Sequence, residues 1–248
     1  MAKGWYGNKF GHSLASRGIK TKCINNNSYE FPEYLDYEDV GIESIMYEYN
    51  KCIGENAIFG ARAYAGSRHY DMNHFLLTGQ QTGEYIHENG EIGWNQEIME
   101  EAIDDFKEYI KNAPKYHGEV WRGMGLDLEY PLDKELLEKI IHASKTGEPL
   151  NFGTFLSTSV LYSSAYNYIY GQDLPIMIRI HKGNNSGVYL GNAIFRAIDE
   201  DDDYNQNEVV FSPDAQFKVV NFKSKNYYFN TFRGEEKKVG YYLEMEEI

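Results

Sequence analysis

The stretch FGTFLSTSV, Phe152–Val160, places three small hydroxyl residues in succession, Ser157, Thr158 and Ser159, at the start of an expected strand. By itself such a run is more typical of an ordinary sheet edge than of a functional site, because short motifs recur by chance. Its meaning therefore depends on the segments that precede and follow it in the chain.

Two segments give this run a context. EVWRGMG, residues 119–125, places Arg122 at the end of a short apolar run, followed by glycines that allow a ligand to approach the backbone. DYNQNEVVF, residues 203–211, ends an acidic loop with Gln206, one spacer and Glu208, directly before strand-forming residues. Alone, Arg122 is more typical of a surface or salt-bridging arginine. The ordered set of arginine strand, Ser-Thr-Ser strand and Gln-x-Glu turn is far more specific than any of its parts.

Composition restricts the class of protein. The 248 residues suffice for one substantial core, and 42% of them are hydrophobic and 15% aromatic, as in a globular protein. The formal net charge of −14 argues against a general binder of nucleic acid or anionic membranes, because such binding needs a lysine and arginine surface. No apolar run approaches the roughly 20 residues of a membrane span. The N-terminus also lacks the apolar core of a secretory signal, so we expect no membrane partner and a cytoplasmic location.

Cysteine and histidine provide no sign of a metal. Cys23 and Cys52 are the only cysteines, too few for a disulfide framework or a thiolate zinc site, and we interpret them as two ordinary thiols. His12 and His69 have no partners at the spacing that metal ligands require, so we expect no metal.

The chain divides into an N-terminal arm or adaptor segment, residues 1–35, and one domain, residues 36–248. The first segment is rich in Gly, Asn, Ser and Lys and lacks helical or strand periodicity. Amphipathic helices are predicted over residues 37–53, 95–113 and 133–147. The helix over residues 95–113 has an apolar stripe of Ile98, Ala102, Ile103, Phe106 and Ile110.

Short strands follow residue 149. They are predicted at residues 175–180, 187–191, 208–212 and 217–222, with a final hairpin-like pair at 225–232 and 240–248. Helices first and strands afterwards favour an α+β fold with a mostly antiparallel sheet.

The ordered set resembles the Arg-Ser-Glu mono-ADP-ribosyltransferases, and within them the bacterial exoenzyme toxin branch with a Gln-x-Glu turn. The resemblance extends from about residue 36 to the end of the chain. It implies the mono-ADP-ribosyltransferase fold, with two packed, mostly antiparallel sheets and N-terminal helices flanking an NAD cleft. It also implies an enzyme that cleaves its co-substrate NAD and transfers ADP-ribose, with NAD glycohydrolase side activity.

The resemblance gives roles to the three residues of the set. Glu208 would stabilise the positive charge that develops on the ribose as nicotinamide leaves, in a transition state akin to that of glycoside hydrolysis. Ser157 would hydrogen-bond Glu208 and hold it in place. Arg122 would bind the pyrophosphate through the forked geometry of a guanidinium.

Further cofactor contacts are implied by the resemblance: Gly123, Thr158, Ser159, Tyr64, Asn73 and Tyr168. Gly123 lies where the family's backbone meets the nicotinamide amide, and Tyr168 would stack on the nicotinamide. Tyr64 and Asn73, in YAGSRHYDMNHFL, match a helical segment that lies over the cofactor. The chain departs from the family in residues 160–173, which contain no arginine although many exoenzymes have a phosphate-binding one there.

Gln206 indicates which kind of group accepts the ADP-ribose. In relatives that modify arginine this position is a second glutamate, which orients the guanidinium, whereas a neutral amide hydrogen-bonds another amide or a base edge. The resemblance thus favours a non-arginine protein side chain, Asn or Gln, as acceptor. A nucleic-acid base is the alternative, and a protein partner is favoured over nucleic acid. A third interpretation is a phage structural or packaging protein with a vestigial transferase domain, because residues 3–22 resemble a segment of phage and mobile-element proteins. A phage or toxin-system partner would bind through residues 1–35.

Overall fold

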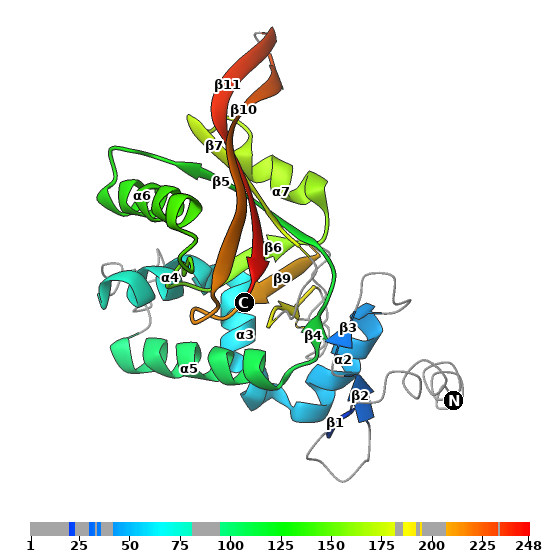
Figure 1. The fold of residues 1–248 in the computed structure, drawn as a ribbon. Coiled ribbons are helices and arrows are strands. Elements are labelled where there is room, and N and C mark those ends of the chain that lie inside the picture. Colours follow the sequence, from blue (N-terminus) through cyan, green and yellow to red (C-terminus); the bar gives the residue numbers. More distant parts are fainter. Residues whose placement is uncertain are drawn as a thin grey trace.

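The computed structural model describes the backbone of residues 20–22, 30–32, 34–35, 42–80, 95–181, 186–191, 194, 207–232 and 234–248. Nine strands are hydrogen-bonded in the order β10-β11-β7-β5-β6-β9-β8-β4-β3, and two more, β1 and β2, form a separate small sheet. Helices flank the nine-stranded sheet (Figure 1), so the predicted α+β fold is confirmed.

The helical elements are α2 (Ile42–Ile53), η1 (Glu55–Ile58), α3 (Phe59–Ala63), η2 (Tyr64–Arg68), α4 (His69–Thr78), α5 (Gln96–Asn112), α6 (Pro131–Thr146) and α7 (Tyr162–Ile169). The three predicted helices are present as α2, α5 and α6. Asn95 caps α5, with its side chain accepting a hydrogen bond from the N–H of Ile98, and α6 ends at Gly147 in the left-handed conformation. The predicted stripe of α5 was wrong in part, because Met99 and Tyr109 are buried and Ile98 is only partly buried.

The strands are β1 (Lys20–Lys22), β2 (Glu30–Pro32), β3 (Tyr34–Leu35), β4 (Lys115–Tyr116), β5 (Val120–Leu126), β6 (Leu156–Ser159), β7 (Leu174–Ile180), β8 (Val188–Tyr189), β9 (Glu208–Phe211), β10 (Phe217–Thr231) and β11 (Gly234–Glu247). In the nine-stranded network, β11–β7 and β3–β4 are parallel pairs, and the other neighbouring pairs are antiparallel.

A single residue pair joins two halves of this network. The strands β10, β11, β7 and β5 make one half, and β6, β9, β8, β4 and β3 make the other. Strands β5 and β6 pair only at Trp121 and Ser159. The two expected sheets are thus two halves that meet at one point, and the residues beside that point are the ones that the sequence singled out.

The C-terminal hairpin is longer than predicted. Residues 217–222 and 225–232 were expected as separate strands but form the continuous strand β10, which pairs with β11 along its length. Its far end extends beyond the other strands (Figure 1). Helix α7 supports this end, because the Tyr166 hydroxyl donates to the carbonyl of Tyr228 (2.9 Å) and that of Tyr170 to the carbonyl of Asn230 (2.5 Å).

A cluster of buried rings places the helices on β6. The ring centroids of Tyr64 and Phe106 lie 4.8 Å apart, those of Phe106 and Phe155 4.6 Å, and those of Tyr64 and Phe155 5.2 Å. Tyr64 begins η2, Phe106 belongs to α5, and Phe155 directly precedes β6. Burial of these three rings, at about 150–250 Å² each, therefore fixes η2 and α5 against the Ser-Thr-Ser strand.

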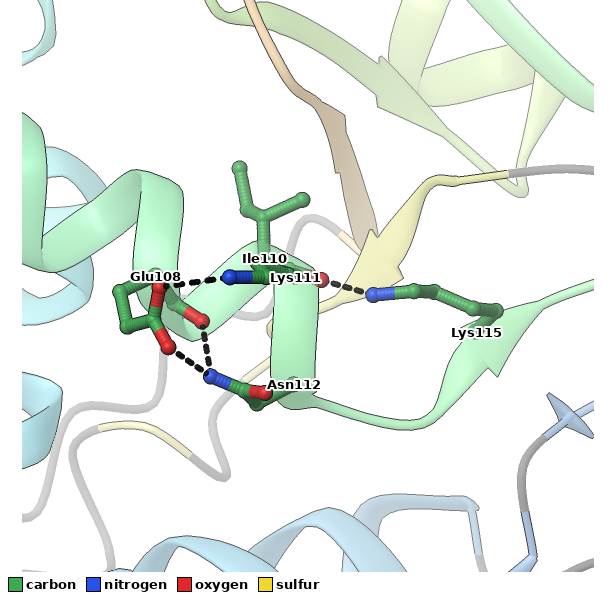
Figure 2. A network of polar contacts seen from close by, with 5 residues as sticks. All are labelled: Glu108, Ile110, Lys111, Asn112 and Lys115. Carbon is green, nitrogen blue, oxygen red and sulfur yellow. Dashed lines mark hydrogen bonds and ion pairs between the residues drawn. The ribbon is translucent and has the colours of Figure 1, made fainter.

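Polar contacts fix the passage from α5 into β4 (Figure 2). The side-chain amide of Asn112 donates to the carbonyl oxygen (2.9 Å) and the carboxylate (2.6 Å) of Glu108. The ammonium of Lys115 donates to the carbonyl of Ile110. These bonds satisfy carbonyl groups that the end of a helix leaves unpaired, and they set the direction in which the chain continues toward β5.

Two expectations for the N-terminal part were wrong. Residues 20–22 and 30–32 form antiparallel strands, although we expected no regular structure there. Cys52 is disulfide-bonded and is not an ordinary thiol; Cys23 lies outside the described residues. Residues 1–19, with most of the predicted partner-binding segment, also lie outside them. Among the helices that the structure describes, none combines the length and apolar character needed to cross a bilayer.

Candidate active site

Arg122 connects the two halves of the sheet network where β5 and β6 diverge. Beyond the pair of Trp121 and Ser159 the strands no longer pair, and Nη1 of Arg122 donates to the carbonyl of Ser157 (2.6 Å). Burial lowers the pKa of the Arg122 guanidinium, and Tyr64 and Glu208 partly offset this. Its Nε is buried and has no hydrogen-bond partner among the described residues. A buried N–H without a partner is costly, and an anionic ligand would remove that cost.

Glu208 lies on the same face of the sheet as Ser157. It opens β9, where its register partner on β6 is Ser159, and Ser157 is the diagonal neighbour. Burial raises the pKa of Glu208 to about 7, while a hydrogen bond with Ser157 and the charge of Arg122 act in the opposite direction. The three residues of the ordered set thus meet, although they come from three strands.

Tyr64 extends this group from the helical side. Its hydroxyl lies 2.7 Å from Oγ of Ser157, and the side-chain amide of Asn73 lies 3.4 Å from the same hydroxyl. A serine hydroxyl has one proton, so when Ser157 donates to ionised Glu208 it accepts from Tyr64. Asn73 in turn donates to the Tyr64 hydroxyl, which also lies 3.3 Å from the carbonyl of Phe155. When Tyr64 gives its proton to Ser157, the hydrogen bonds through Tyr64 and Ser157 point toward the carboxylate.

Asn73 also holds the backbone before β6. Its amide nitrogen donates to the carbonyl of Phe155 (3.2 Å), and its amide oxygen accepts from the N–H of Phe155 (3.0 Å). Tyr64 is only 2% exposed. The structure therefore places these two residues behind Ser157, as supports for the strand and the carboxylate.

Three of the expected cofactor contacts have packing or hydrogen-bond roles. The hydroxyl of Thr158 donates to the carbonyl of Val209 (2.7 Å), and the hydroxyl of Ser159 accepts from the N–H of Leu161 (3.1 Å). A Cβ at Gly123 would overlap the carbonyl of Ala165 in α7, so glycine is required for α7 to pack on β5.

The remaining expected residues lie on either side of the site. Residues 160–173, which lack arginine, form α7 and its ends. Tyr168 on this helix is 52% exposed, and its phenol acts to raise the pKa of the Arg122 guanidinium, so it lies near that group. Gln206 lies outside the described residues, which resume at Asn207.

The sequence analysis missed Asn207, the spacer between Gln206 and Glu208. Among the described residues it is the non-glycine residue with positive φ, at 48°. Asparagine adopts this left-handed conformation more readily than most residues, so its type and its place in a turn were a usable signal.

Comparison with known proteins establishes the fold. No protein-family model matches the sequence, and no curated protein matches it. Among solved structures, the chain is similar to the Vis toxin, an ADP-ribosyltransferase from Vibrio splendidus, with a TM-score of 0.53 and 17% identity over 86% of this chain and 88% of that chain.

Two toxin components are similar to the same extent. The ADP-ribosylating toxin BECa of a binary enterotoxin of C. perfringens, solved with NADH, has a TM-score of 0.53 and 22% identity, covering 87% of this chain and 50% of BECa. The enzymatic component C2-I of the C2-toxin from Clostridium botulinum has the same TM-score and coverage at 15% identity. The chain spans half of these two proteins. It has the fold of bacterial ADP-ribosyltransferase toxins.

Proposed function

We propose that this chain is an NAD-dependent mono-ADP-ribosyltransferase that transfers ADP-ribose to a macromolecule. The observation that supports it most strongly is the meeting of Arg122, Ser157 and Glu208 where the two halves of the sheet join. Each has the environment that its proposed role needs: a buried cation with an N–H that lacks a partner among the described residues, and a carboxylate held by a serine.

The residues present fit NAD as the co-substrate. Arg122 would bind the pyrophosphate, whose charge satisfies the buried guanidinium and offers an acceptor to Nε. Glu208 would stabilise the positive charge on the ribose as the bond to nicotinamide breaks. Tyr168 would stack on the nicotinamide, and the backbone of Gly123 would contact its amide. Tyr64, Asn73, Thr158 and Ser159 would act indirectly, by holding β6 and the serine.

The acceptor in this proposal is a non-arginine protein side chain, Asn or Gln. Gln206 supports it, because a neutral amide cannot accept a proton from a guanidinium but can pair with another amide. The net charge of −14 disfavours a nucleic acid as the acceptor. Slow hydrolysis of NAD would accompany transfer, since water needs no amide to position it.

The experiment that tests this function uses NAD labelled in its ADP-ribose part, a cell lysate and the purified protein. We expect label in macromolecules that protease removes and nuclease leaves intact. If nuclease removes the label and protease does not, the acceptor is a nucleic acid and not a protein. Absence of both labelled macromolecules and NAD turnover would contradict the function, and would favour a vestigial transferase domain.

The pH dependence of NAD hydrolysis should report Glu208. Because burial raises its pKa to about 7, the carboxyl is largely protonated, and so inactive, below that pH. We expect kcat/KM for NAD to fall about tenfold per pH unit below pH 7 and to level off above about pH 8. Initial rates of nicotinamide release, measured from pH 5 to 9, give the dependence of kcat/KM on pH. A rate independent of pH across this range would show that ionisation of Glu208 is not required.

Replacing Gln206 should separate the choice of acceptor from cleavage of NAD. Gln206→Ala should lose transfer and keep most of the hydrolysis, while Gln206→Glu should gain transfer to a free guanidinium compound such as agmatine. The measurement is the ratio of transfer to hydrolysis in each variant. If Gln206 only caps the turn through backbone hydrogen bonds, both rates would instead fall in parallel in both variants, and that result would remove its proposed role.

A further inference from the structure

The side-chain amide of Asn73 can take only one orientation beside Tyr64. Its oxygen accepts from the backbone N–H of Phe155 (3.0 Å), and a backbone N–H can only donate. The amide nitrogen therefore takes the other position, where it donates to the carbonyl of Phe155 (3.2 Å) and to the hydroxyl of Tyr64 (3.4 Å). A fixed backbone group thus decides that the oxygen of Tyr64 accepts a hydrogen bond.

The proton of Tyr64 has two possible acceptors. Oγ of Ser157 lies 2.7 Å from the Tyr64 hydroxyl, and the carbonyl of Phe155 lies 3.3 Å from it. Hydrogen bonds from a hydroxyl to an oxygen are usually about 2.5–3.0 Å long. The carbonyl of Phe155 also accepts already from Asn73. Tyr64 therefore donates to Ser157.

Ser157 in turn donates to Glu208. A serine hydroxyl has one proton, so a Ser157 that accepts from Tyr64 gives its own proton to the carboxyl of Glu208, with which it is hydrogen-bonded. A hydrogen bond donated to a carboxylate stabilises its ionised form, and a donor that itself accepts a hydrogen bond donates more strongly. The hydrogen bonds from Asn73 through Tyr64 and Ser157 therefore oppose the burial that raises the pKa of Glu208 to about 7.

The other groups around Glu208 act independently of these hydrogen bonds. Among the described residues, the charged or titratable groups that act on its carboxyl are Arg122 from β5 and Tyr64 from η2. Tyr168 on α7 acts on Arg122, and from β8 the backbone N–H of Leu190 donates to the carbonyl of Glu208 (2.9 Å). Burial raises the pKa of Tyr64 to about 12, so its phenol is neutral where Glu208 titrates and acts through its hydrogen bond.

We propose that Tyr64 is a positioning residue whose hydroxyl directs the proton of Ser157 toward Glu208 and so keeps the carboxylate ionised. The inference rests on the proposed function, in which that carboxylate stabilises the ribose cation. It goes further because it separates two roles of one side chain. The ring of Tyr64 packs on Phe106 and Phe155, and its hydroxyl sets the pH above which the enzyme is active.

Tyr64→Phe tests the proposal, because it keeps the ring and removes the hydroxyl. Asn73 keeps both of its hydrogen bonds to Phe155. We expect the midpoint of the pH profile of kcat/KM for NAD to rise by about 0.5–1 pH unit, the contribution of one hydrogen bond. The ratio of kcat/KM at pH 6 to kcat/KM at pH 9 should then fall about three- to tenfold. Initial rates of nicotinamide release give the profile.

Tyr109→Phe is the matched control. Tyr109 on α5 is also buried, and its hydroxyl donates to the side-chain amide oxygen of Asn50 on α2 (2.7 Å). This variant should leave the midpoint unchanged even if it lowers the melting temperature. A lower melting temperature with an unchanged midpoint in Tyr64→Phe would show that the Tyr64 hydroxyl serves folding alone, and would overturn the proposal.

A double variant shows whether Tyr64 acts through Ser157. Ser157→Ala should itself raise the midpoint, and adding Tyr64→Phe should raise it no further, because the hydrogen bond between the two residues is already lost. Additive rises would mean that the phenol acts on Glu208 directly, and the proposed route through Ser157 would be wrong.

The ionisation of Glu208 can also be followed without activity. In protein labelled with carbon-13 at the glutamate carboxyls, the signal that Glu208→Gln lacks is that of Glu208. The midpoint of this signal should rise in Tyr64→Phe and stay unchanged in Tyr109→Phe, and equal midpoints in wild type and Tyr64→Phe would overturn the inference even in an active enzyme. A wild type that neither transfers ADP-ribose nor hydrolyses NAD would contradict the proposed function, while the carboxyl titration alone would still decide the role of Tyr64.

Discussion

Glu208→Gln is expected to abolish both ADP-ribose transfer and NAD hydrolysis while the fold survives. The amide keeps the shape and can still accept a hydrogen bond from Ser157, but it lacks the negative charge that stabilises the ribose cation. Removing one such electrostatic stabiliser costs about 10²–10³ in rate. Nicotinamide release and label incorporation, measured on the same preparation, give the two rates. Either rate within tenfold of wild type would refute the proposed role of Glu208.

Glu247→Gln is the matched control for this change. Glu247 is a second carboxyl whose pKa is raised by burial and which bonds a serine, since it accepts from the backbone N–H of Ser186 at 2.7 Å. It is the last residue of β11 and has no proposed part in the reaction. Its amide variant should keep both activities, so loss of activity in both variants would point to disturbed folding.

Stability provides an independent check on Glu208. A carboxyl whose folded-state pKa is raised from 4.5 to about 7 destabilises the fold as pH rises through that interval, because the folded state resists ionisation. Glu208→Gln should therefore be more stable than wild type above pH 7, by on the order of 1–3 kcal/mol, and the difference should vanish toward pH 4.5. Thermal unfolding at the two pH values measures it.

Arg122→Ala should act mainly on the binding of NAD. A charge-assisted contact with the pyrophosphate is present in the ground state and in the transition state alike, so its loss raises KM and affects kcat less. Hydrogen bonds to charged groups contribute roughly 1.5–3 kcal/mol, so we expect KM for NAD to rise about 10- to 100-fold. Arg122→Lys should lie in between, since it keeps the charge and loses the fork. Initial rates of nicotinamide release over a range of NAD concentrations separate KM from kcat.

Arg179→Ala is the control for this experiment. Arg179 lies on the neighbouring strand β7, and its guanidinium already pairs with Glu119, Nε to carboxylate at 2.7 Å. It should leave KM for NAD unchanged. An unchanged KM in Arg122→Ala as well would show that Arg122 only links β5 to the carbonyl of Ser157.

The meeting of Arg122, Ser157 and Glu208 could be predicted from the sequence, because their order along successive strands carries the information. Their register could not. Ser157 and Glu208 share a face only because Ser159 pairs with Glu208, and that pairing is decided by packing between distant segments. For the same reason Tyr64 could be singled out but not placed behind the serine, since its position depends on rings from three elements.

The errors in the strand and helix predictions have local causes. Lys223 and Ser224 have weak strand propensity and so seemed to interrupt β10, but pairing with β11 keeps them extended. In α5, Met99 replaces Ile98 in the core because the buried face of this helix is rotated by one residue at its start. The hydrogen bond from the hydroxyl of Tyr189 to the carboxylate of Glu43 could not be predicted from the sequence, because the two residues are 146 positions apart.

The most direct test of the central claim is one incubation of the purified protein with a lysate and NAD that is labelled separately in its nicotinamide and ADP-ribose parts. The proposed function predicts that free nicotinamide accumulates with time, and that the amount of ADP-ribose label in macromolecules does not exceed the amount of nicotinamide released. Glu208→Gln should show neither product. Intact NAD after prolonged incubation with the wild-type protein, or equal turnover by Glu208→Gln, would contradict it.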